Sequence, residues 1–481
     1  MSFQDLLPGW PVIAGLLSVA LALVASGHAI LNKSDHRATV GWVGVIWLAP
    51  VLGSLLYLLF GINRIRRRAS SLREPLNRVQ GESDLGAYSP EALESFVPEA
   101  LQSLSRLSSQ VALQPLLGGN AVSALVDGDK AYPAMLAAIE GAQHSIGLST
   151  YIFNRDRVGR RFVDALARAV NRGVEVRVLV DAVGLRYSLP TIEGLLRRER
   201  IPFARFMPPR WPWTLPFVNL RNHRKLLVVD GTKGFVGGMN IAEGNCVAEN
   251  PAHPVRDLHF RVEGPLVSEL QAVFVEDWQF SSGESLSGPD WFPAPETPGA
   301  VLGRVIADGP DERYDTIRQV MLGAVSLARF HIRIKTPYFL PDKSLADSLI
   351  TAALRGVIVD VIVPEQNNLP FVDWAMQAQI APLLRRGVRI SRAPGVFDHS
   401  KLMTVDGQWA FVGSANWDPR SLSLNFECNL ECYDAWTTSE LERFFDHRLW
   451  TARSIEAQAL QTLPWLKRLR NGLARLLTPY M

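Results

Sequence analysis

One sequence pattern occurs twice in the chain, and this duplication limits the folds that the chain can adopt. The first copy, HRKLLVVDGTKGFVGGMN, begins at His223, and the second, HSKLMTVDGQWAFVGSAN, begins at His399. Each copy reads H-x-K, four residues, Asp, six residues, Gly, two residues, Asn. Residue frequencies alone predict about 0.01 copies of H-x-K-x4-D in such a chain. The two copies therefore indicate a duplicated structural unit.

The duplication extends well beyond the motif. Residues 125–153 and 305–339 share the order strand, Asp-Gly turn, helix, strand, and a further helix and strand follow each of them. Strands that alternate with helices in this way predict βαβ units. We expect an α/β fold of two tandem repeats, each with a mixed, largely parallel sheet, and the two sheets packed face to face. The expected repeats span residues 116–290 and 291–481.

The motif itself predicts a cluster of polar side chains. The apolar run that follows each H-x-K predicts a buried strand, and residues two apart on a strand point to the same side. The glycines that end the motif allow a tight turn, which brings the final Asn back toward the same place. Two facing units then place six side chains around one point. They are His223, Lys225, Asn240, His399, Lys401 and Asn416.

Two imidazoles beside two lysines suit a phosphodiester. Its cleavage requires a nucleophile, a proton donor for the leaving group and neutralisation of the phosphate charge. A solvated strand edge is the alternative for a single copy, but the repetition disfavours it. A zinc site is rejected because no Cys or carboxylate lies at ligand spacing and a lysine accompanies each His. No metal or other cofactor is expected.

These motifs resemble the paired H-x-K-D motifs of the phospholipase D superfamily, over roughly residues 120–450. NLRNHRKLLVVDG, RDLHFRVEGP, TPYFLPD, the apolar N-terminus and the C-terminal LTPYM are similar to bacterial cardiolipin synthases in particular. The resemblance implies transfer of a phosphatidyl group between two phosphatidylglycerol molecules through a phosphohistidine, with release of glycerol. Hydrolysis by a membrane-bound phospholipase D, or transfer from another donor such as phosphatidylethanolamine, is the alternative. Two apolar segments and a net charge of only +3 disfavour a nuclease, and the complete motifs disfavour an inactive scaffold.

The resemblance also implies roles for single residues. His223 is the expected nucleophile, and His399 is the expected general acid and then base. Asp257 and Glu427 are expected to be the carboxylates that orient the two imidazoles.

Three further residues complete the expected site. Ser414 stands where the first copy has Gly238, so the second copy alone can offer a hydroxyl to the substrate phosphate beside the two asparagines. Asp230 and Asp406 belong to the catalytic motif. We expect them to stabilise the turn at the strand end or to pair with basic residues.

Two uncharged apolar segments near the N-terminus predict a transmembrane hairpin within residues 1–68. Helices at about 11–31 and 39–62 are long enough to cross a hydrocarbon layer of roughly 30 Å. A cleaved signal peptide is disfavoured because no basic residue precedes the first segment. Arg64, Arg66, Arg67 and Arg68 follow the second segment, and the positive-inside rule places them in the cytoplasm. The sequence thus predicts a multi-pass protein of the bacterial cytoplasmic membrane with its catalytic part in the cytoplasm, joined by a linker at 69–115.

Two other segments are candidates for lipid contact. The aromatic segment MPPRWPWTLPFVN, residues 207–219, precedes His223, and packing on its own sheet is the alternative. Near the C-terminus, leucines at helical spacing predict a basic amphipathic helix, which suits either a cap on the domain or membrane contact. The leucines are Leu466, Leu469, Leu473 and Leu476, and the basic residues are Lys467, Arg468, Arg470 and Arg475. The expected partners are phospholipids and the membrane, without nucleic acid, and homo-oligomerisation stays open.

Overall fold

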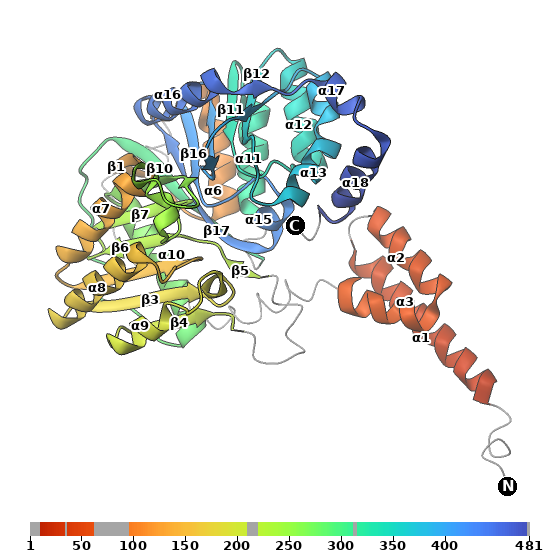
Figure 1. The fold of residues 1–481 in the computed structure, drawn as a ribbon, viewed down its shortest axis with the longest axis horizontal. Coiled ribbons are helices and arrows are strands. Elements are labelled where there is room, and N and C mark those ends of the chain that lie inside the picture. Colours follow the sequence, from red (N-terminus) through yellow and green to blue (C-terminus); the bar gives the residue numbers. More distant parts are fainter. Residues whose placement is uncertain (1–9, 34–35, 62–95, 209–219, 311–314, 479–481) are drawn as a thin grey trace, which may run out of the picture. The chain divides into compact units, whose positions relative to one another are not determined.

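The computed structural model describes residues 10–33, 36–61, 96–208, 220–310 and 315–478 (Figure 1). The chain divides into two units, an N-terminal unit and a main body that contains both motif copies. The predicted basic flank at Arg64–Arg68 and most of the aromatic segment 207–219 lie outside the described residues.

The N-terminal unit contains a long apolar helix, α1 (Trp10–Asn32). Among the described residues, only the stretch Val12–Asn32 of this helix is both long and apolar enough to cross a membrane. At about 1.5 Å per residue, α1 is longer than the roughly 30 Å hydrocarbon layer. The first predicted span therefore corresponds to one continuous helix.

The second predicted span, 39–62, is not one continuous helix. The structure has α2 (His36–Leu48), α3 (Pro50–Leu56) and a π-helical turn at Tyr57–Gly61. The break falls at Ala49, whose φ and ψ of −144° and 80° are not helical, because Pro50 lacks the N–H that would continue the helix. α2 and α3 both pack against α1, and His28 Nδ1 lies 2.8 Å from the hydroxyl of Tyr57.

The main body consists of two halves with the same order of elements. The first half has β1 (Leu117–Val126), α7 (Asp127–Glu140), β2 (Ser145–Thr150), α8 (Arg157–Asn171), β3 (Glu175–Asp181), α9 (Glu193–Arg198), β4 (Phe203–Phe206), β5 (Arg221–Asn222), β6 (Leu226–Val229), β7 (Lys233–Gly237), β8 (Val255–Arg256), β9 (Leu258–Glu263) and α10 (Leu266–Ser282). The second half has β10 (Val301–Asp308), α11 (Thr316–Leu327), β11 (His331–Lys335), α12 (Lys343–Leu354), β12 (Ile358–Pro364), α13 (Pro370–Gln379), α14 (Ala381–Arg385), β13 (Arg389–Ala393), β14 (Phe397–Asp398), β15 (Leu402–Val405), β16 (Trp409–Gly413), α15 (Pro419–Ser423), β17 (Asn425–Tyr433) and α16 (Ala435–Thr451). β18 (Arg453–Ser454), α17 (Ala457–Gln461) and α18 (Trp465–Leu476) follow.

The strands of each half form a mixed sheet. In the first half the order is β4-β3-β2-β6-β7-β9-β1, and in the second it is β13-β12-β11-β15-β16-β17-β10. Within these orders, only β2, β3 and β4, and likewise β11, β12 and β13, pair in parallel. The prediction of largely parallel sheets was therefore wrong, because each motif copy forms an antiparallel hairpin, β6–β7 or β15–β16.

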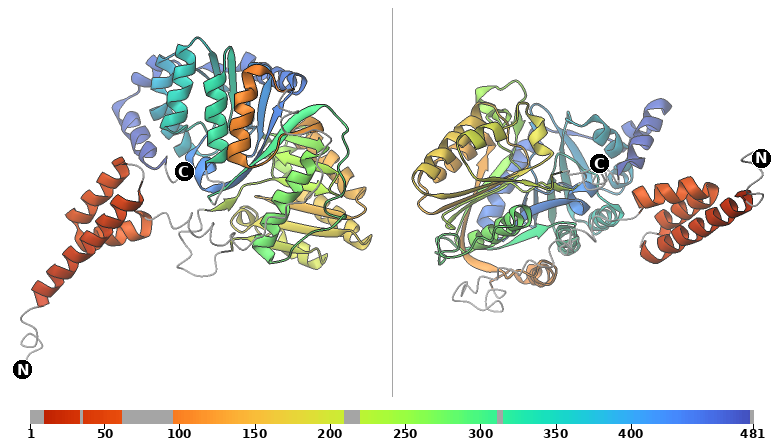
Figure 2. Two further views of the ribbon diagram at one scale, coloured as in Figure 1. Left: turned by 180° about the vertical axis from the view of Figure 1, so that it is seen from behind. Right: turned by 90° about the horizontal axis from the view of Figure 1, so that it is seen from below.

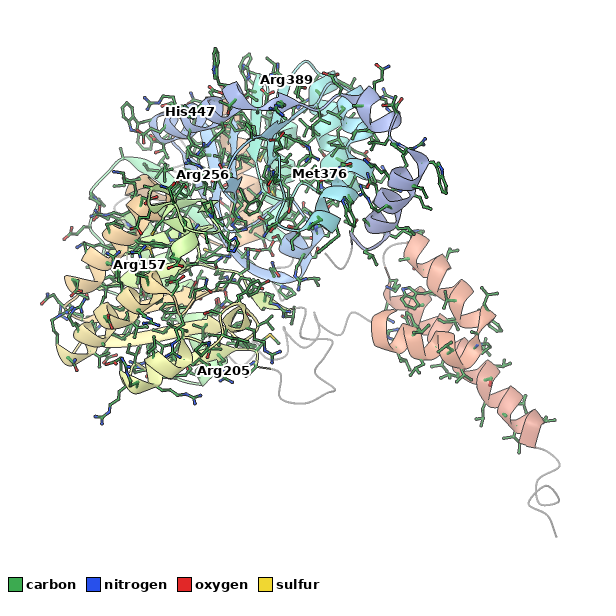
Figure 3. All side chains as sticks on the ribbon, in the orientation of Figure 1. Arg157, Arg205, Arg256, Met376, Arg389 and His447 are labelled. Carbon is green, nitrogen blue, oxygen red and sulfur yellow. The ribbon has the colours of Figure 1, made fainter. Side chains whose placement is uncertain are left out.

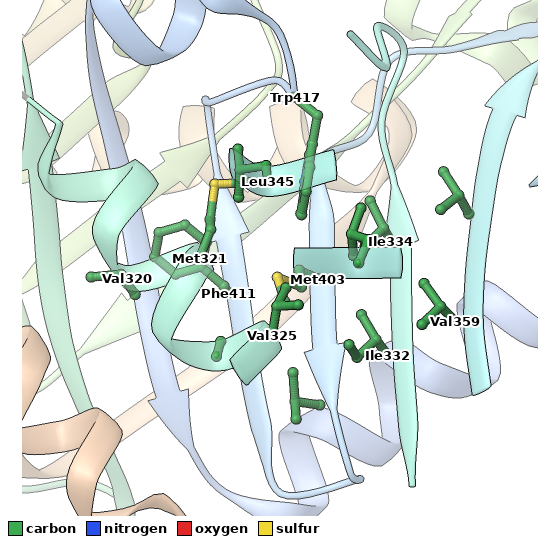
Figure 4. Close-up of a cluster of buried hydrophobic side chains, with 14 of the residues drawn as sticks. Val320, Met321, Val325, Ile332, Ile334, Leu345, Val359, Met403, Phe411 and Trp417 are labelled. Carbon is green, nitrogen blue, oxygen red and sulfur yellow. The ribbon is translucent and has the colours of Figure 1, made fainter. Parts of the chain in front are cut away.

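Helices cover the outer face of each sheet. In the second half, Met321 and Val325 of α11 pack on Ile332 and Ile334 of β11 and on Phe411 of β16 (Figure 4). α7 and α8 cover the corresponding face of the first sheet. The other face of the first sheet is covered by α10, whose Phe274 and Leu270 lie against Gly147 of β2 and Gly234 of β7, and α16 packs on the second sheet.

The two halves share one buried apolar cluster. It combines Leu226 and Val228 of β6 with Leu402 of β15 and Leu430 of β17, and residues of α10 and α16 complete it. The sheets are also joined edge to edge, because β1 pairs with β10 in addition to β9. The edge connection through β1 was not predicted, and the expected face-to-face packing of the two sheets stays a prediction.

A helix that precedes the first half packs in the second half. α6 (Gln102–Ala112) lies against α11, and Leu104 and Ala112 belong to the apolar cluster of the second half (Figure 2, left). Arg304 and Glu431 form a buried ion pair at 2.6 Å, and Ser108 of α6 donates a hydrogen bond to Glu431. The predicted linker 69–115 therefore ends in a packed helix.

Candidate active site

Each half extends a short strand into the other half, immediately before its motif histidine. β5 pairs in parallel with the start of β17, with Asn222 opposite Phe426. β14 pairs in parallel with β8, with Asp398 opposite Arg256. Arg256 is labelled in Figure 3. A backbone hydrogen bond continues each pairing. The N–H of His223 donates to the carbonyl of Phe426, and the N–H of His399 donates to the carbonyl of Arg256.

This register places each imidazole beside a carboxylate of the other half. His223 follows Asn222 and Glu427 follows Phe426, and His223 Nδ1 lies 3.0 Å from both carboxylate oxygens of Glu427. His399 Nδ1 lies 2.8 Å from Asp257 Oδ2 in the same manner. The resemblance had implied both carboxylates, but it had not indicated which histidine each of them contacts.

The pairing determines which ring nitrogen is available for chemistry. An ionised carboxylate can only accept a hydrogen bond, so we assign the proton of each neutral imidazole to Nδ1. Nε2 then keeps its lone pair. Both His223 and His399 line a cavity of about 1200 Å3 that is walled by both halves.

The two lysines of the motif are buried beside the histidines. Lys225 Nζ donates a hydrogen bond to the carbonyl of His223 at 2.6 Å, and it lies 5.5 Å from the ring centre of Tyr151. Lys401 Nζ contacts the carbonyl of His399 and lies 2.7 Å from its Nδ1. Burial lowers the pKa of Lys225 to about 7 and that of Lys401 to about 8.

Burial also shifts the ionisation of the other groups. It lowers the pKa of His399 to about 4, and the pKa of His223 lies well below its usual value for the same reason, aided by the two lysines. Burial raises the pKa of Glu427 to about 7. A site without a bound anion thus favours neutral imidazoles, as a nucleophile requires.

Both asparagines of the motif reach the cavity. Asn240 and Asn416 are among its lining residues, in equivalent positions of the two halves. Asn240 Oδ1 accepts a hydrogen bond from the backbone N–H of Ile152 at 3.1 Å. This contact fixes the side chain and directs its amide nitrogen away from the strand, where it can donate.

The two motif aspartates do not contact the cavity. The carboxylate of Asp230 accepts hydrogen bonds from the backbone N–H groups of Gln143, His144 and Ser145. Asp406 accepts from the equivalent segment, Arg329 to His331, at 2.8 Å each. We therefore no longer count Asp230 and Asp406 among the catalytic residues. Their position agrees with the other expected role, the stabilisation of a turn. Each one fixes the loop that leads into β2 or β11.

Ser414 also differs from the expectation. Its hydroxyl donates to Glu427 Oε2 at 2.5 Å and accepts from the backbone N–H of Cys428, and it is fully buried. The Ser414 hydroxyl thus already forms hydrogen bonds with Glu427 and Cys428, and it does not face the position of a substrate phosphate. In the first half a Cβ at Gly238 would collide with the carboxylate of Asp257, so a side chain there would displace the group that contacts His399.

Several cavity residues were not identified from the sequence. Tyr151 and Tyr338 end the equivalent segments after β2 and β11, and their rings lie 5.2 and 6.1 Å from those of His223 and His399. The equivalent positions of the two tyrosines in the aligned repeats could have identified them as site residues. Arg221 and Arg420 also line the cavity, but they belong to different elements, β5 and α15, so no repeated pattern marks them.

Comparison with known proteins agrees with this architecture. The family model described as cardiolipin synthase, PLD-like domain, matches residues 135–278 and 321–450, and a phospholipase D-nuclease N-terminal model matches 20–61. A cardiolipin synthase of Geobacillus kaustophilus is 32% identical over 98% of this chain and 94% of its own length. Cardiolipin synthase 2 of Bacillus anthracis is 32% identical over 95% of this chain and 89% of its own length.

One solved structure supports the fold alone. The phosphatidylserine synthase of Haemophilus influenzae superimposes with a TM-score of 0.59 at 14% identity, over 79% of this chain and 100% of its own. The matched family model covers both motif copies and more than half of the sequence, and the similarity to the relatives extends over nearly the full length. The chain therefore belongs to the cardiolipin synthase family of phospholipase D-like proteins.

Proposed function

We propose that the protein is a cardiolipin synthase, which transfers a phosphatidyl group from one phosphatidylglycerol to another and releases glycerol. One observation carries the proposal: two histidines, each paired with a carboxylate of the other half, face one cavity together with two asparagines. The family membership supports the choice of phospholipid as substrate. The lipid specificity itself is part of the proposal.

In the first step, His223 Nε2 attacks the phosphorus of the donor lipid. A P–N bond forms, the bond from phosphorus to the glycerol oxygen breaks, and His399 donates its proton to that oxygen. Glu427 holds the His223 ring and stabilises its positive charge. The free site keeps His399 neutral, so the negative charge of the bound phosphodiester has to raise its pKa before it can act as an acid.

In the second step, a hydroxyl of the second lipid replaces the glycerol. His399, now neutral, accepts the hydroxyl proton while the oxygen attacks phosphorus. The P–N bond breaks, and His223 leaves as a neutral imidazole. One phosphodiester is exchanged for another, so the proposed reaction consumes no nucleotide.

Cationic and amide groups of the cavity are placed to neutralise the phosphate. Lys225 and Lys401 are buried beside the two imidazoles, behind the residues that line the cavity, so we assign them a longer-range attraction to the phosphate. Both motif asparagines line the cavity and can donate to the non-bridging oxygens. The second lipid brings another phosphate close to the first one. Arg221 and Arg420 add two further cations to the wall of the cavity, and we assign them to this additional charge.

The size and lining of the cavity also suit lipids. Pockets for small ligands usually measure roughly 300–1,000 Å3, and this cavity exceeds that range at about 1200 Å3. Leu189, Leu369, Phe371 and Val372 contribute apolar surface to its wall. Apolar surface of this kind fits the acyl and glycerol parts of two phospholipids.

The direct test is product analysis with the full chain in detergent and labelled phosphatidylglycerol. Cardiolipin and glycerol should form, and His223→Ala should abolish both products. Acid-quenched wild-type enzyme should contain a phosphohistidine that His223→Ala lacks, and His399→Ala should slow both steps, because the leaving and entering oxygens lack their proton carrier. His144→Ala, a change at an exposed histidine, is the matched control and should leave turnover unchanged.

Other products would point to the alternatives. Phosphatidic acid alone would identify a hydrolase, and cardiolipin formed only with added phosphatidylethanolamine would identify a different donor. Absence of turnover with every phospholipid would contradict the enzymatic proposal.

We further propose that residues 39–62 cross the membrane in addition to α1, with the catalytic part in the cytoplasm. Residues 39–62 carry no charge, and exposed Val40, Leu48 and Leu52 give this segment an apolar surface. A cysteine at Lys33→Cys should react with an impermeant maleimide in intact cells, whereas one at Leu354→Cys should react only after permeabilisation. Reaction of both sites in intact cells, or of neither, would contradict the hairpin.

A further inference from the structure

Helix α18 directs its apolar side away from the protein. Its outward residues are 52–70% exposed, although they are large and hydrophobic. We call this set the α18 stripe; it consists of Trp465, Leu466, Leu469, Leu473, Leu476 and the following Leu477. An amphipathic helix of a globular domain normally turns such a stripe toward the core.

The opposite side of α18 attaches it to the domain. α18 packs on α13 (Figure 1). Ala474 is buried in this contact, and Asn471 donates a hydrogen bond to Gln377 Oε1 at 3.1 Å. The guanidinium of Arg470 lies 4.3 Å from the ring centre of Trp374. Specific polar contacts therefore fix the helix in the orientation that exposes its leucines.

The charge of α18 indicates what covers the stripe. Lys467, Arg468 and Arg475 are exposed beside it, and the helix contains no acidic residue. Basic residues beside an apolar helix face suit a leaflet with anionic headgroups, which attract each of them. A protein groove would need acidic partners for these three charges in addition to an apolar floor.

The stripe is continuous with the mouth of the cavity. Leu477, its last residue, is also a lining residue of the cavity. Phe371 at the start of α13 lines the cavity too and is 41% exposed. An apolar path therefore leads from the outer surface of α18 into the site that holds the two histidines.

We propose that α18 lies at the surface of an anionic bilayer leaflet, with its stripe among the acyl chains, so that the cavity opens directly onto the lipids. The assignment of the occupant follows from the stripe and its charges. Only the choice of phosphatidylglycerol as the anionic lipid rests on the proposed function.

The position of α18 can be measured without any turnover. The three native cysteines are buried, so a cysteine introduced at Leu473→Cys can carry an environment-sensitive NBD group in the full chain. In phosphatidylglycerol nanodiscs its emission should shift to the blue, and doxyl groups on the lipid acyl chains should quench it severalfold. Leu354→Cys is the matched control. Leu354 is 62% exposed at the end of α12, just before β12 begins, and the cavity lies beyond the opposite end of β12.

The outcomes separate the occupants of the stripe. Quenching at position 473 but not at 354 supports the proposal. A blue-shifted emission that doxyl lipids do not quench would mean that another protein segment covers the stripe, and an emission typical of water would mean that nothing does. Either of these two results overturns the proposal, whether or not the enzyme is active.

A kinetic measurement tests the consequence for lipid entry. The double variant L469E/L473E should lower kcat/KM at least tenfold on phosphatidylglycerol in bilayers, because two carboxylates are repelled by the anionic leaflet. The same variant should match the wild type on short-chain phosphatidylglycerol below its micellar concentration. Equal rates on the bilayer would contradict the inference. Loss of both activities would indicate damage to the fold, and the quenching result then decides alone.

Discussion

At the scale of single residues, the carboxylates behind the two histidines are held differently. Glu427 accepts hydrogen bonds from Ser414 and from Asn425 Nδ2 at 3.1 Å, in addition to its contact with His223. Asp257, behind His399, accepts instead from the backbone N–H of Leu258 at 2.8 Å. The more firmly held Glu427 favours His223 as the nucleophile, which must keep one orientation while it carries the phosphatidyl group.

Ser414→Ala tests this difference. The Ser414 hydroxyl stabilises ionised Glu427 and lowers its pKa, so its removal should raise that pKa above the present value of about 7. The acidic limb of the kcat/KM profile should move to higher pH, and kcat should fall about tenfold, as for other residues that orient a reactive group. Ser400→Ala, which removes another buried hydroxyl that bonds Asp398, should leave the acidic limb in place. An unshifted profile in the Ser414 variant would assign Ser414 a purely structural role.

The lysine pKa values predict how pH affects anion binding. Lys225 and Lys401 are protonated below their values of about 7 and about 8, and only the protonated form attracts a phosphate. The affinity for tungstate, a phosphate analogue, should therefore be highest below pH 7 and should fall as pH rises through 8. Inhibition constants measured at constant ionic strength from pH 6 to 9 check this. Affinity that does not change over this range would show that the lysines do not titrate there.

At the scale of elements, the sequence predicted the periodic features and missed those that depend on distant contacts. The βαβ order and the motif strands follow from local hydrophobic patterns, and both were confirmed. The pairings of His223 with Glu427 and of His399 with Asp257 depend on β5 and β14, strands of two residues that no periodicity can reveal. The packing of α6 likewise results from tertiary geometry, whereas the break before Pro50 is local, because a proline lacks the N–H that would continue the helix. Ser414 was misplaced because a strand pattern does not specify what lies behind it.

The variant Leu104→Ala tests how much the packing of α6 stabilises the second half. Leu104 is fully buried, although its segment was expected to be a linker. Leu104→Ala should destabilise the protein by about 2–5 kcal/mol, because it leaves a cavity in the core. Leu113→Ala, at an exposed leucine just after the same helix, should have almost no effect. Denaturation of the full chain in detergent compares the two variants, and equal midpoints would mean that α6 does not contribute to the core.

At the scale of the whole molecule, Arg224 connects the two halves directly behind the site. Its Nη1 pairs with both oxygens of Asp277 at 2.7 Å, while Nε and Nη2 donate to the carbonyls of Glu427 and Asp308 in the other half. All of these groups are buried. The charge of Arg224 is thus neutralised within its own half, whereas its Nε and Nη2 donors find their acceptors only when the two halves are assembled.

Arg224→Met should therefore destabilise the assembled molecule. Removal of one partner leaves the Asp277 carboxylate buried without its main cation, and such changes cost about 3–5 kcal/mol. The unfolding midpoint should fall and activity should fall with it, since the carbonyl of Glu427 loses a donor. Arg157→Met, which breaks the exposed pair with Glu249, is the control and should change the midpoint very little. A variant at position 224 with a wild-type midpoint would contradict this role.

The exchange of β5 and β14 between the halves has a consequence for the ancestry of the chain. A single repeat contains a histidine and a carboxylate that cannot reach each other, so it could build this site only as a symmetric pair of identical copies. In such a pair, every substitution appears twice. Within one polypeptide the two copies can differ, as Gly238 and Ser414 do at equivalent positions. A site with two identical histidines could thereby acquire two unequal ones.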